Sequence, residues 1–199
     1  MKKSISKEEL QELSIKAFEG KIIVINTEEE AKKIIPYLQK QKRLGFDTET
    51  RPTFKKGAMN KVALLQLSTE STAILFRLNK IGLPTKLANI LSNKNIIKAG
   101  VAINDDIKEL KILNKFTPGG FVEIQQKVKE FGIENFGLKK LSGLLLGFNI
   151  SKSQQVSNWE AEPLTPAQIK YAATDAWVSL KIYNKLINIE KNINNTEID

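Results

Sequence analysis

Two carboxylates share one face of a predicted strand in the first quarter of the chain. The stretch RLGFDTET, residues 43–50, predicts a strand, and Asp47 and Glu49 lie two residues apart within it. Because successive strand residues point to opposite faces, both acids project together, while Leu44 and Phe46 project to the other face. Like charges that are buried together repel each other, and a bound cation would remove that cost. The alternative is an edge strand whose two carboxylates are solvated.

Two further acids, Asp105 and Asp106, follow a second predicted strand, residues 95–99, where a helix is expected to begin. Acidic side chains in the first turn of a helix are commonly caps, and Asn104 or Asp105 suits that role. Asp106 then lies one residue inside the helix and is free to point elsewhere. The alternative is that this acid only caps the helix.

A tyrosine and an acid lie four residues apart in the last predicted helix. In the stretch YAATD, Tyr171 and Asp175 occupy positions i and i+4, which share one helical face. The small residues between them allow the helix to approach another element closely. The plainer interpretation is a partly buried tyrosine beside an acid in the first half of the helix.

Taken together, these stretches predict one site with four carboxylates: Asp47, Glu49, Asp106 and Asp175. Oxygen ligands without a nitrogen ligand suit hard cations such as Mg²⁺ or Mn²⁺. Two such ions about 3.5–4 Å apart clamp the attacking and leaving oxygens when a phosphodiester is displaced in line. The Tyr171 hydroxyl could orient the attacking water, although an ordinary pKa of about 10 makes it a poor base.

The composition excludes several other chemistries. The 199 residues include no histidine and no cysteine. The chain therefore has no imidazole base or ligand, no thiol nucleophile, no disulfide and no cysteine-based metal site. The formal net charge is +9, carried mostly by lysine. A basic domain attracts polyanions, nucleic acid first, although a general coding bias towards lysine would give the same charge.

The remaining pattern predicts the elements that must position these acids. Strands are expected at residues 21–25, 43–50, 61–68, 72–77 and 95–99, the third and fourth forming a hairpin. Helices are expected from Ser6 to near Gly20, from Thr27 to about Lys42, from Pro84 to about Leu91, from Asn104 or Asp105 onward, over 123–131 and 137–147, and from Pro166 to about Glu190. TPGGF and residues 149–164 are expected to be loops.

The expected architecture is one α/β domain with a mixed central sheet flanked by helices. We expect a helical extension over residues 1–20, the main domain over residues 21–190 and a polar tail over residues 191–199. The sequence shows no signal peptide or membrane span, so we expect a cytoplasmic protein.

Four ordered stretches resemble the motifs of the ribonuclease D and Werner-type 3′–5′ exonucleases: FDTET, KVALLQLS, KAGVAINDD and SNWEAEPLTPAQIKYAATDA. A single motif such as D-x-E is weak, whereas the order and spacing of all four are specific. The resemblance covers residues 21–187, nearly the whole chain. It implies a ribonuclease-H-like fold of the DnaQ-like group and a 3′–5′ exonuclease that releases nucleoside 5′-monophosphates from DNA or RNA.

The resemblance also assigns roles residue by residue. It implies that four acids bind two divalent cations: Asp47, Glu49, Asp106 and Asp175. Tyr171 would position the nucleophilic water, as in the DEDDy subgroup; the sister subgroup uses a histidine, which this chain lacks. The spacing of KAGV and the following isoleucine in KAGVAINDD matches Asp106, not Asp105, to the family's aspartate. Relatives often have glycine or glutamate at the position before that aspartate. Ribonuclease D itself has further helical nucleic-acid-binding domains, for which 199 residues leave no room. The match is therefore nearer to the Werner-type exonuclease domain.

Residues after the first acidic strand are expected to contact nucleic acid. Phe54 could stack on a terminal base, and Lys55 and Lys56 could meet phosphates, although a loop of cations is more often simply solvated. The backbone of Thr48 lies between two metal-binding acids and could approach the terminal nucleotide. Its side chain is expected to face the core.

Lys152 and Asn158 lie in a polar segment that resembles the family's substrate-side loop, with Trp159 expected to anchor that loop in the core. The alternative to an enzyme is a non-catalytic nucleic-acid-binding module on the same fold. A further alternative is an enzyme of this fold that cuts internally or acts on RNA only. The sequence does not separate DNA from RNA, because recognition of the 2′-hydroxyl depends on fine geometry.

Overall fold

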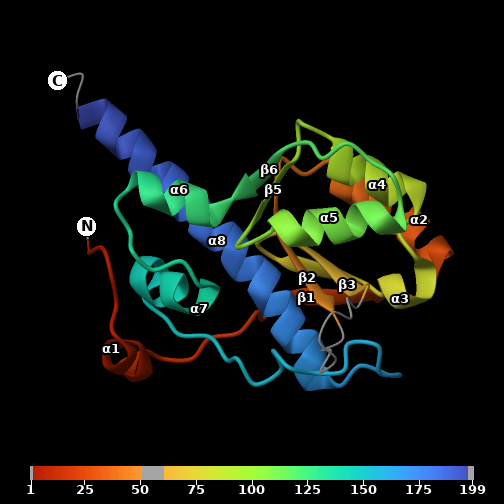
Figure 1. Ribbon diagram of the computed structural model, residues 1–199, viewed down its shortest axis with the longest axis horizontal. Helices are drawn as coiled ribbons and strands as arrows, with labels where there is room; N and C mark the ends of the chain where they lie inside the picture. The colour runs from red at the N-terminus through yellow and green to blue at the C-terminus, as the bar shows by residue number, and fades with distance from the viewer. Residues whose placement is uncertain (1, 51–60, 197–199) are drawn as a thin grey trace.

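The computed structural model describes residues 2–50 and 61–196. In this part of the chain six strands form one sheet: β1 (Lys21–Ile25), β2 (Arg43–Thr50), β3 (Val62–Ser68), β4 (Thr72–Phe76), β5 (Ile97–Gly100) and β6 (Phe121–Glu123). Their order is β1-β4-β3-β2-β5-β6 (Figure 1). β3 runs antiparallel to β2 and β4, and the other neighbours are parallel, so the sheet is mixed as expected.

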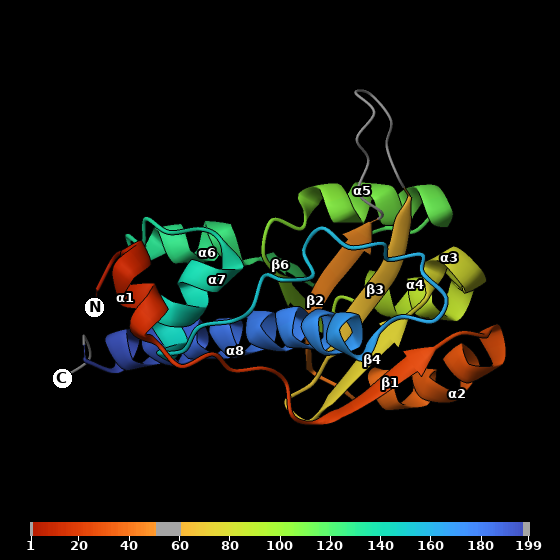
Figure 2. The same cartoon turned by 90° about the horizontal axis from the view of Figure 1, so that it is seen from below.

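Helices cover both faces of this sheet. The described helices are α1 (Lys7–Glu12), α2 (Glu28–Gln39), α3 (Leu78–Ile81), α4 (Thr85–Ser92), α5 (Asn104–Leu113), α6 (Ile124–Glu130), α7 (Leu138–Leu141), the π-helical turn η1 (Ser142–Leu146) and α8 (Pro166–Thr196). The long α8 crosses one face of the sheet, and α2, α4 and α5 pack on the other (Figures 1 and 2). None of these helices is both long and apolar enough to cross a lipid bilayer.

The strand that carries the first acidic pair is an interior strand. On one side Asp47 of β2 is paired with Gln66 of β3, and on the other side Gly45 is paired with Ala99 of β5. The edge-strand alternative for Asp47 and Glu49 is therefore wrong. Both acids lie near the carboxyl end of a strand that has a neighbour on each side.

Helix α8 touches β2 backbone to backbone. A Cβ atom built on Gly45 would lie 1.8 Å from the carbonyl oxygen of Ala176, closer than any real contact. Ala172, Ala173 and Ala176 are fully buried on the same helix, so small side chains line the contact. This close approach places the preceding turn of α8, which carries Tyr171 and Asp175, over the acidic end of β2.

The start of α8 follows the sequence prediction. The amide of Gln168 donates to the Thr165 hydroxyl at 3.2 Å, and the Gln168 side-chain oxygen accepts from the amide of Thr165 at 2.9 Å. This reciprocal capping box, with Pro166 at the first helical position, fixes where the helix begins. The helix runs to Thr196, beyond the expected end near Glu190, because no glycine or proline interrupts it after Pro166.

The N-terminal helix is shorter than expected. It was predicted from Ser6 to near Gly20, and α1 ends at Glu12. Beyond it the backbone pairs with residue 149: the Lys16 amide donates to the Asn149 carbonyl, and the Asn149 amide donates to the Ser14 carbonyl, each at 2.9 Å. These tertiary bonds outweigh the helical spacing of the apolar side chains, because propensity alone is a weak constraint.

Three further elements differ from the sequence prediction. β6 and α3 were not predicted, because three and four residues are too few to show a period. The expected helix over 137–147 is divided into α7 and η1.

Replacing Gly45 by alanine is expected to destabilise the protein by about 3 kcal/mol, because the new methyl group must push β2 and α8 apart. Chemical denaturation measures this change. Gly137→Ala is the matched control, since nothing lies within 4 Å of a Cβ at that position and its φ is −81°. The control is expected to shift stability by less than about 1 kcal/mol. Equal free energies of unfolding for Gly45→Ala and Gly137→Ala would show that β2 and α8 can move apart without loss of stability.

Candidate active site

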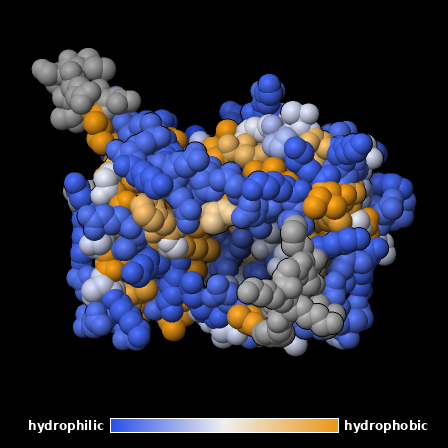
Figure 3. Space-filling view, in the orientation of Figure 1, coloured by the Kyte–Doolittle hydropathy of each residue, from blue (hydrophilic) through white to orange (hydrophobic). Residues whose placement is uncertain are grey.

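A polar pocket of about 250 Å³ opens at the carboxyl end of β2. Its wall combines β2 with α8 and with the segment between η1 and α8; the lining includes Asp47, Thr48, Glu49, Ser151, Lys152, Tyr171, Asp175 and Ser179. Figure 3 shows a central hollow with hydrophilic residues within and above it and more hydrophobic residues along its left side. Elements far apart in the sequence therefore meet at one opening.

Three of the four predicted acids lie together in this pocket. Asp47, Glu49 and Asp175 each offer a carboxylate oxygen within 4.8 Å of the other two. Strand alternation turns the two β2 acids to the face that α8 covers, and the contact of Gly45 with Ala176 brings α8 close enough to add the third.

Asp106 reaches the site from the other side of β2. It lies in the first turn of α5, outside the group of three, and its carboxylate accepts a hydrogen bond from the Thr48 hydroxyl at 2.5 Å. The expectation that the Thr48 side chain faces the core is wrong, because β2 extends past the apolar layer at this residue and the hydroxyl meets Asp106 instead.

A residue from β6 holds the turn that leads into α5. The Glu123 carboxylate accepts from the amides of Ala102 at 2.9 Å and Ile103 at 2.7 Å. Neither Asn104 nor Asp105 caps the helix, contrary to the sequence prediction. Asp105 is exposed and pairs with Lys108 at 2.6 Å.

The sequence predicted that Asp106 would be free to point away from the helix end, and its carboxylate indeed accepts from the Thr48 hydroxyl. The turn before the helix is constrained as well, since Ala102 has a φ of 61°, which is uncommon outside glycine.

The clustered carboxyl groups hold their protons unusually tightly. Burial, followed by Glu49, Asp175 and Asp106, raises the pKa of Asp47 well above its ordinary range. Burial and the neighbouring acids raise the pKa of Glu49 to about 9. Burial raises the pKa of Asp175 to about 7, although the Tyr171 hydroxyl and the charge of Lys152 oppose this shift. Burial is thus the largest cause of these shifts, and repulsion between the acids adds to it for Asp47 and Glu49.

Tyr171 stays protonated in this environment. Its side chain is 9% exposed, and burial together with the charges of Asp175 and Glu49 raises the pKa of its hydroxyl. Its ring lies 5.9 Å from that of Trp159, centroid to centroid. A neutral, fixed hydroxyl can donate or accept a hydrogen bond but cannot act as a base near neutral pH.

The residues present fit a hard divalent cation. Every candidate ligand is a carboxylate oxygen, and the Oδ1 atom of Asp175 is buried with no hydrogen-bond partner among the described residues. An unpaired buried acceptor is costly, and a cation would both satisfy it and offset the repulsion between the acids.

The segment before α8 forms one wall of the pocket. Trp159 is fully buried and anchors this segment, as predicted, and the Arg77 guanidinium donates to the Ala161 carbonyl at 2.7 Å. Lys152 lines the pocket near Asp175. Asn158 is exposed and does not line it; its side-chain oxygen accepts from the Glu160 amide.

Some of the predicted nucleic-acid contacts cannot be placed. Phe54, Lys55 and Lys56 lie outside the described residues.

Sequence reasoning missed a polar neighbour of Asp47. Gln66 of β3 is paired directly with Asp47, its side chain is fully buried, and its amide nitrogen and oxygen have no partner in residues 2–50 and 61–196. The signal was present, because Gln66 interrupts an apolar run in KVALLQLS. Lys139, which also lines the pocket, gave no such signal.

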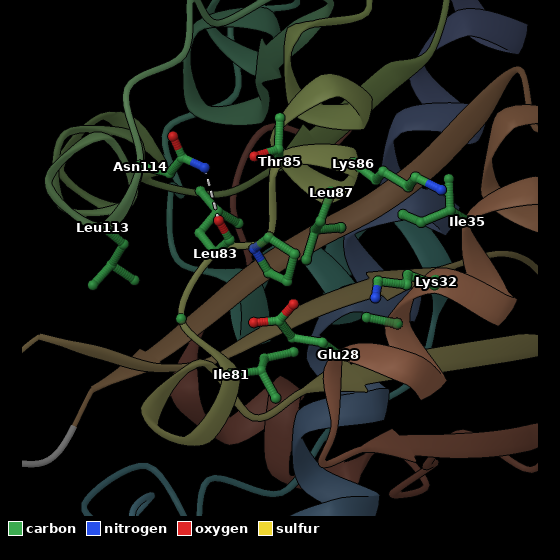
Figure 4. A pocket seen from close by; sticks show the side chains of 13 residues that line it. Glu28, Lys32, Ile35, Ile81, Leu83, Thr85, Lys86, Leu87, Leu113 and Asn114 are labelled. Carbon is green, nitrogen blue, oxygen red and sulfur yellow. Dashed lines mark hydrogen bonds between the residues drawn. The ribbon is translucent and has the colours of Figure 1, made fainter.

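A larger pocket of about 470 Å³ lies elsewhere, between α2, α4 and the end of α5 (Figure 4). Its lining includes one acid, Glu28, with Lys32 and Lys86, and an Asn114 side chain that donates to the Leu83 carbonyl at 2.9 Å. This larger pocket has no group of carboxylates that could bind a metal ion. The size of a pocket therefore does not identify the active site in this protein.

Residues 22–190 match a family model described as 3'-5' exonuclease. The chain belongs to the 3′–5′ exonuclease family. The resemblance inferred from the ordered motifs is thereby confirmed, and with it an enzyme class, phosphodiester hydrolases, that acts on nucleic acid.

Two curated relatives support the assignment. This exonuclease chain is 38% identical over 158 residues to the bifunctional 3'-5' exonuclease/ATP-dependent helicase WRN of Mus musculus, covering 73% of this chain and 11% of that protein. It is 35% identical over 154 residues to exonuclease 3'-5' domain-containing protein 2 of Drosophila melanogaster, covering 75% of this chain and 26% of that protein. The exonuclease chain therefore spans only a small part of these relatives.

The fold also matches a solved structure. Escherichia coli RNase D, an exoribonuclease involved in structured RNA processing, superposes with a TM-score of 0.76 at 24% identity, covering 82% of this chain and 44% of that one. The expected ribonuclease-H-like fold of the exonuclease is thus confirmed.

The metal-free exonuclease is expected to lose stability as the pH rises from about 5 to about 8. The carboxyls of Asp175 and Glu49 have ordinary pKa values of 3.8 and 4.5 and folded values of about 7 and about 9. The folded state therefore binds more protons, and the stability this contributes is lost as the pH rises through the folded pKa values. Thermal unfolding in EDTA should show a fall of several degrees.

Two controls accompany this measurement. Saturating Mn²⁺ should abolish the fall, and Asp47→Asn should flatten it by removing one charge from the group. The upper limit of pH 8 matters because burial lowers the pKa of Lys98 to about 8, and titration of that group above this pH changes stability in the opposite direction. A metal-free melting temperature that rises between these limits would contradict the assigned repulsion.

Proposed function

We propose that this chain is a two-metal-ion-dependent exonuclease that removes nucleotides one at a time from a free 3′ end of DNA or RNA. The observation that carries the proposal is the convergence of Asp47, Glu49 and Asp175 within 4.8 Å, with Asp106 beside them. Water attacks the last phosphodiester, the bond from phosphorus to the 3′ oxygen breaks, and a nucleoside 5′-monophosphate leaves. The shortened strand keeps a 3′-hydroxyl.

The four acids would hold the cations. Asp47, Glu49 and Asp175 form the principal ligand group, and Asp106 would contribute from the α5 side, with its orientation set by the Thr48 hydroxyl. When bound, the ions lower the pKa of the attacking water and neutralise charge on the leaving oxygen. The chain has no histidine to serve as a base in this step, and Tyr171 stays protonated.

Tyr171 would orient the nucleophilic water. Its hydroxyl lies in the pocket beside Asp175, and packing against Trp159 restricts its ring. A neutral hydroxyl accepts one hydrogen bond and donates another, so it can fix a water molecule without taking its proton. Lys152, which lines the same pocket, would attract the phosphate at the site.

The proposal is tested with 5′-labelled single-stranded DNA and RNA in Mg²⁺, Mn²⁺ or EDTA. The wild-type chain is expected to give a one-nucleotide ladder that requires metal and to show which sugar it prefers. Asp47→Ala should reduce this activity to background, because the principal ligand group is lost. The variant should remain folded, and without metal it should be more stable than wild type, since less repulsion remains.

Asp105→Ala is the matched control, because Asp105 neighbours a proposed ligand but points to Lys108 in solvent. It should keep wild-type activity, whereas Asp106→Ala should not. Undiminished hydrolysis by Asp47→Ala would refute the metal site. Salt-sensitive binding without any cleavage would indicate a non-catalytic nucleic-acid-binding module instead.

Replacing Tyr171 by phenylalanine is expected to lower kcat by about 10²-fold, the order expected when a reacting group is no longer held in position. The KM for nucleic acid and the midpoint of Mn²⁺ titration should stay the same, because the carboxylates are intact. Tyr183→Phe is the control on the same helix; its ring faces Arg43 rather than the acids. Equal kcat values in both variants would remove Tyr171 from the reaction.

A further inference from the structure

A second hollow of about 420 Å³ adjoins the active-site pocket. It lies between α1 and α7, which run close together in both views (Figures 1 and 2), and the two hollows share Lys139 and Lys152 in their walls. Lys7 and Gln11 of α1 form one side, and Lys140 of α7 lies on the other. A strand leaving the acids along this direction would therefore meet α1.

The N-terminal segment is fixed in place against the domain. Leu10 is buried, its carbonyl accepts from the Asn149 side chain at 2.9 Å, and the Ile5 amide donates to the Asn135 side chain at 2.8 Å. Further along, the Phe18 amide donates to the Thr174 hydroxyl of α8 at 3.0 Å. Helix α1, which precedes the region matched by the family model, is thus a rigid wall of this hollow.

The hollow has the chemistry of a nucleotide subsite. Lys7, Lys139, Lys140 and Lys152 present four ammonium groups, and none makes an ion pair with an acid in the part of the chain that the structure describes. Elsewhere several lysines are neutralised, as Lys108 is by Asp105. Leu10 and the lysine stems supply an apolar floor. Cations around an apolar floor suit phosphates joined to bases and sugars.

We propose that the hollow between α1 and α7 binds the single-stranded part of the substrate upstream of the 3′-terminal nucleotide. This inference rests on the proposed exonuclease function. Lys139 and Lys152, shared by both hollows, continue the path from the acids, and Lys7 and Lys140 bind phosphates farther along the strand. The N-terminal segment thereby extends the substrate groove of the catalytic domain.

The test compares a dodecanucleotide with a dinucleotide as substrates for the double variant Lys7→Glu/Lys140→Glu. The KM for the dodecanucleotide should rise by about tenfold, while kcat stays the same. The dinucleotide should be hydrolysed as by the control, because it does not reach these lysines. The dependence of log K for dodecanucleotide binding on log salt should also become shallower by about 1.4, about 0.7 for each lost phosphate contact.

The matched control is Lys94→Glu/Lys115→Glu, which makes the same change of charge at two exposed loop residues. Lys94 precedes β5 and Lys115 lies between α5 and β6, so both lie towards the amino ends of these strands, whereas the acids lie near the carboxyl end of the parallel strand β2. An equal rise of KM in both double variants would show that the effect comes from the change in net charge alone, and it would overturn the proposed subsite. Normal dodecanucleotide kinetics in Lys7→Glu/Lys140→Glu would overturn it as well. Failure of the exonuclease function itself is distinguishable, because wild type would then cleave neither substrate.

Discussion

The contact between the backbones of Gly45 and Ala176 sets the geometry on which the active site depends. Because residue 45 has no side chain, α8 lies directly on β2, and one acid from the helix can join two acids from the strand. Burial at this contact then raises the pKa of each of the three carboxyls. The close packing of α8 on β2 thus holds three carboxyl groups together although their charges repel each other. Functional sites commonly keep such an unfavourable arrangement in place through the surrounding structure.

The second determinant is the division of the acids between the two faces of the sheet. Asp106 approaches from the α5 side, where the Thr48 hydroxyl donates to its carboxylate and Glu123 accepts from the two amides that precede the helix. The buried amide of Gln66, unpaired among the described residues beside Asp47, adds a polar group at the centre of an otherwise apolar strand. Such groups usually mark functional rather than structural demands.

The sequence predicted well whatever depends on local pattern. The bounds of β1 and β2, the hairpin of β3 and β4 and the cap at Thr165 follow from periodicity and capping chemistry, and the structure has them where expected. The convergence of Asp47, Glu49 and Asp175 follows from alternation and helical spacing once the fold is known. The end of α1 and the contact that holds the turn before α5 did not follow, because Asn149 and Glu123 lie far away in the chain. Tertiary partners of this kind leave no trace in a local window.

The docking of the last helix also affects when the protein becomes an enzyme during its synthesis. The chain is made from the N-terminus, so β2 and its two acids exist long before α8 supplies Tyr171 and Asp175. A nascent chain that lacks α8 has neither Tyr171 nor Asp175, so it lacks one proposed metal ligand and the proposed water-positioning group. Under the proposed function, unfinished chains would therefore lack nuclease activity, and any later detachment of α8 would remove both side chains in one step.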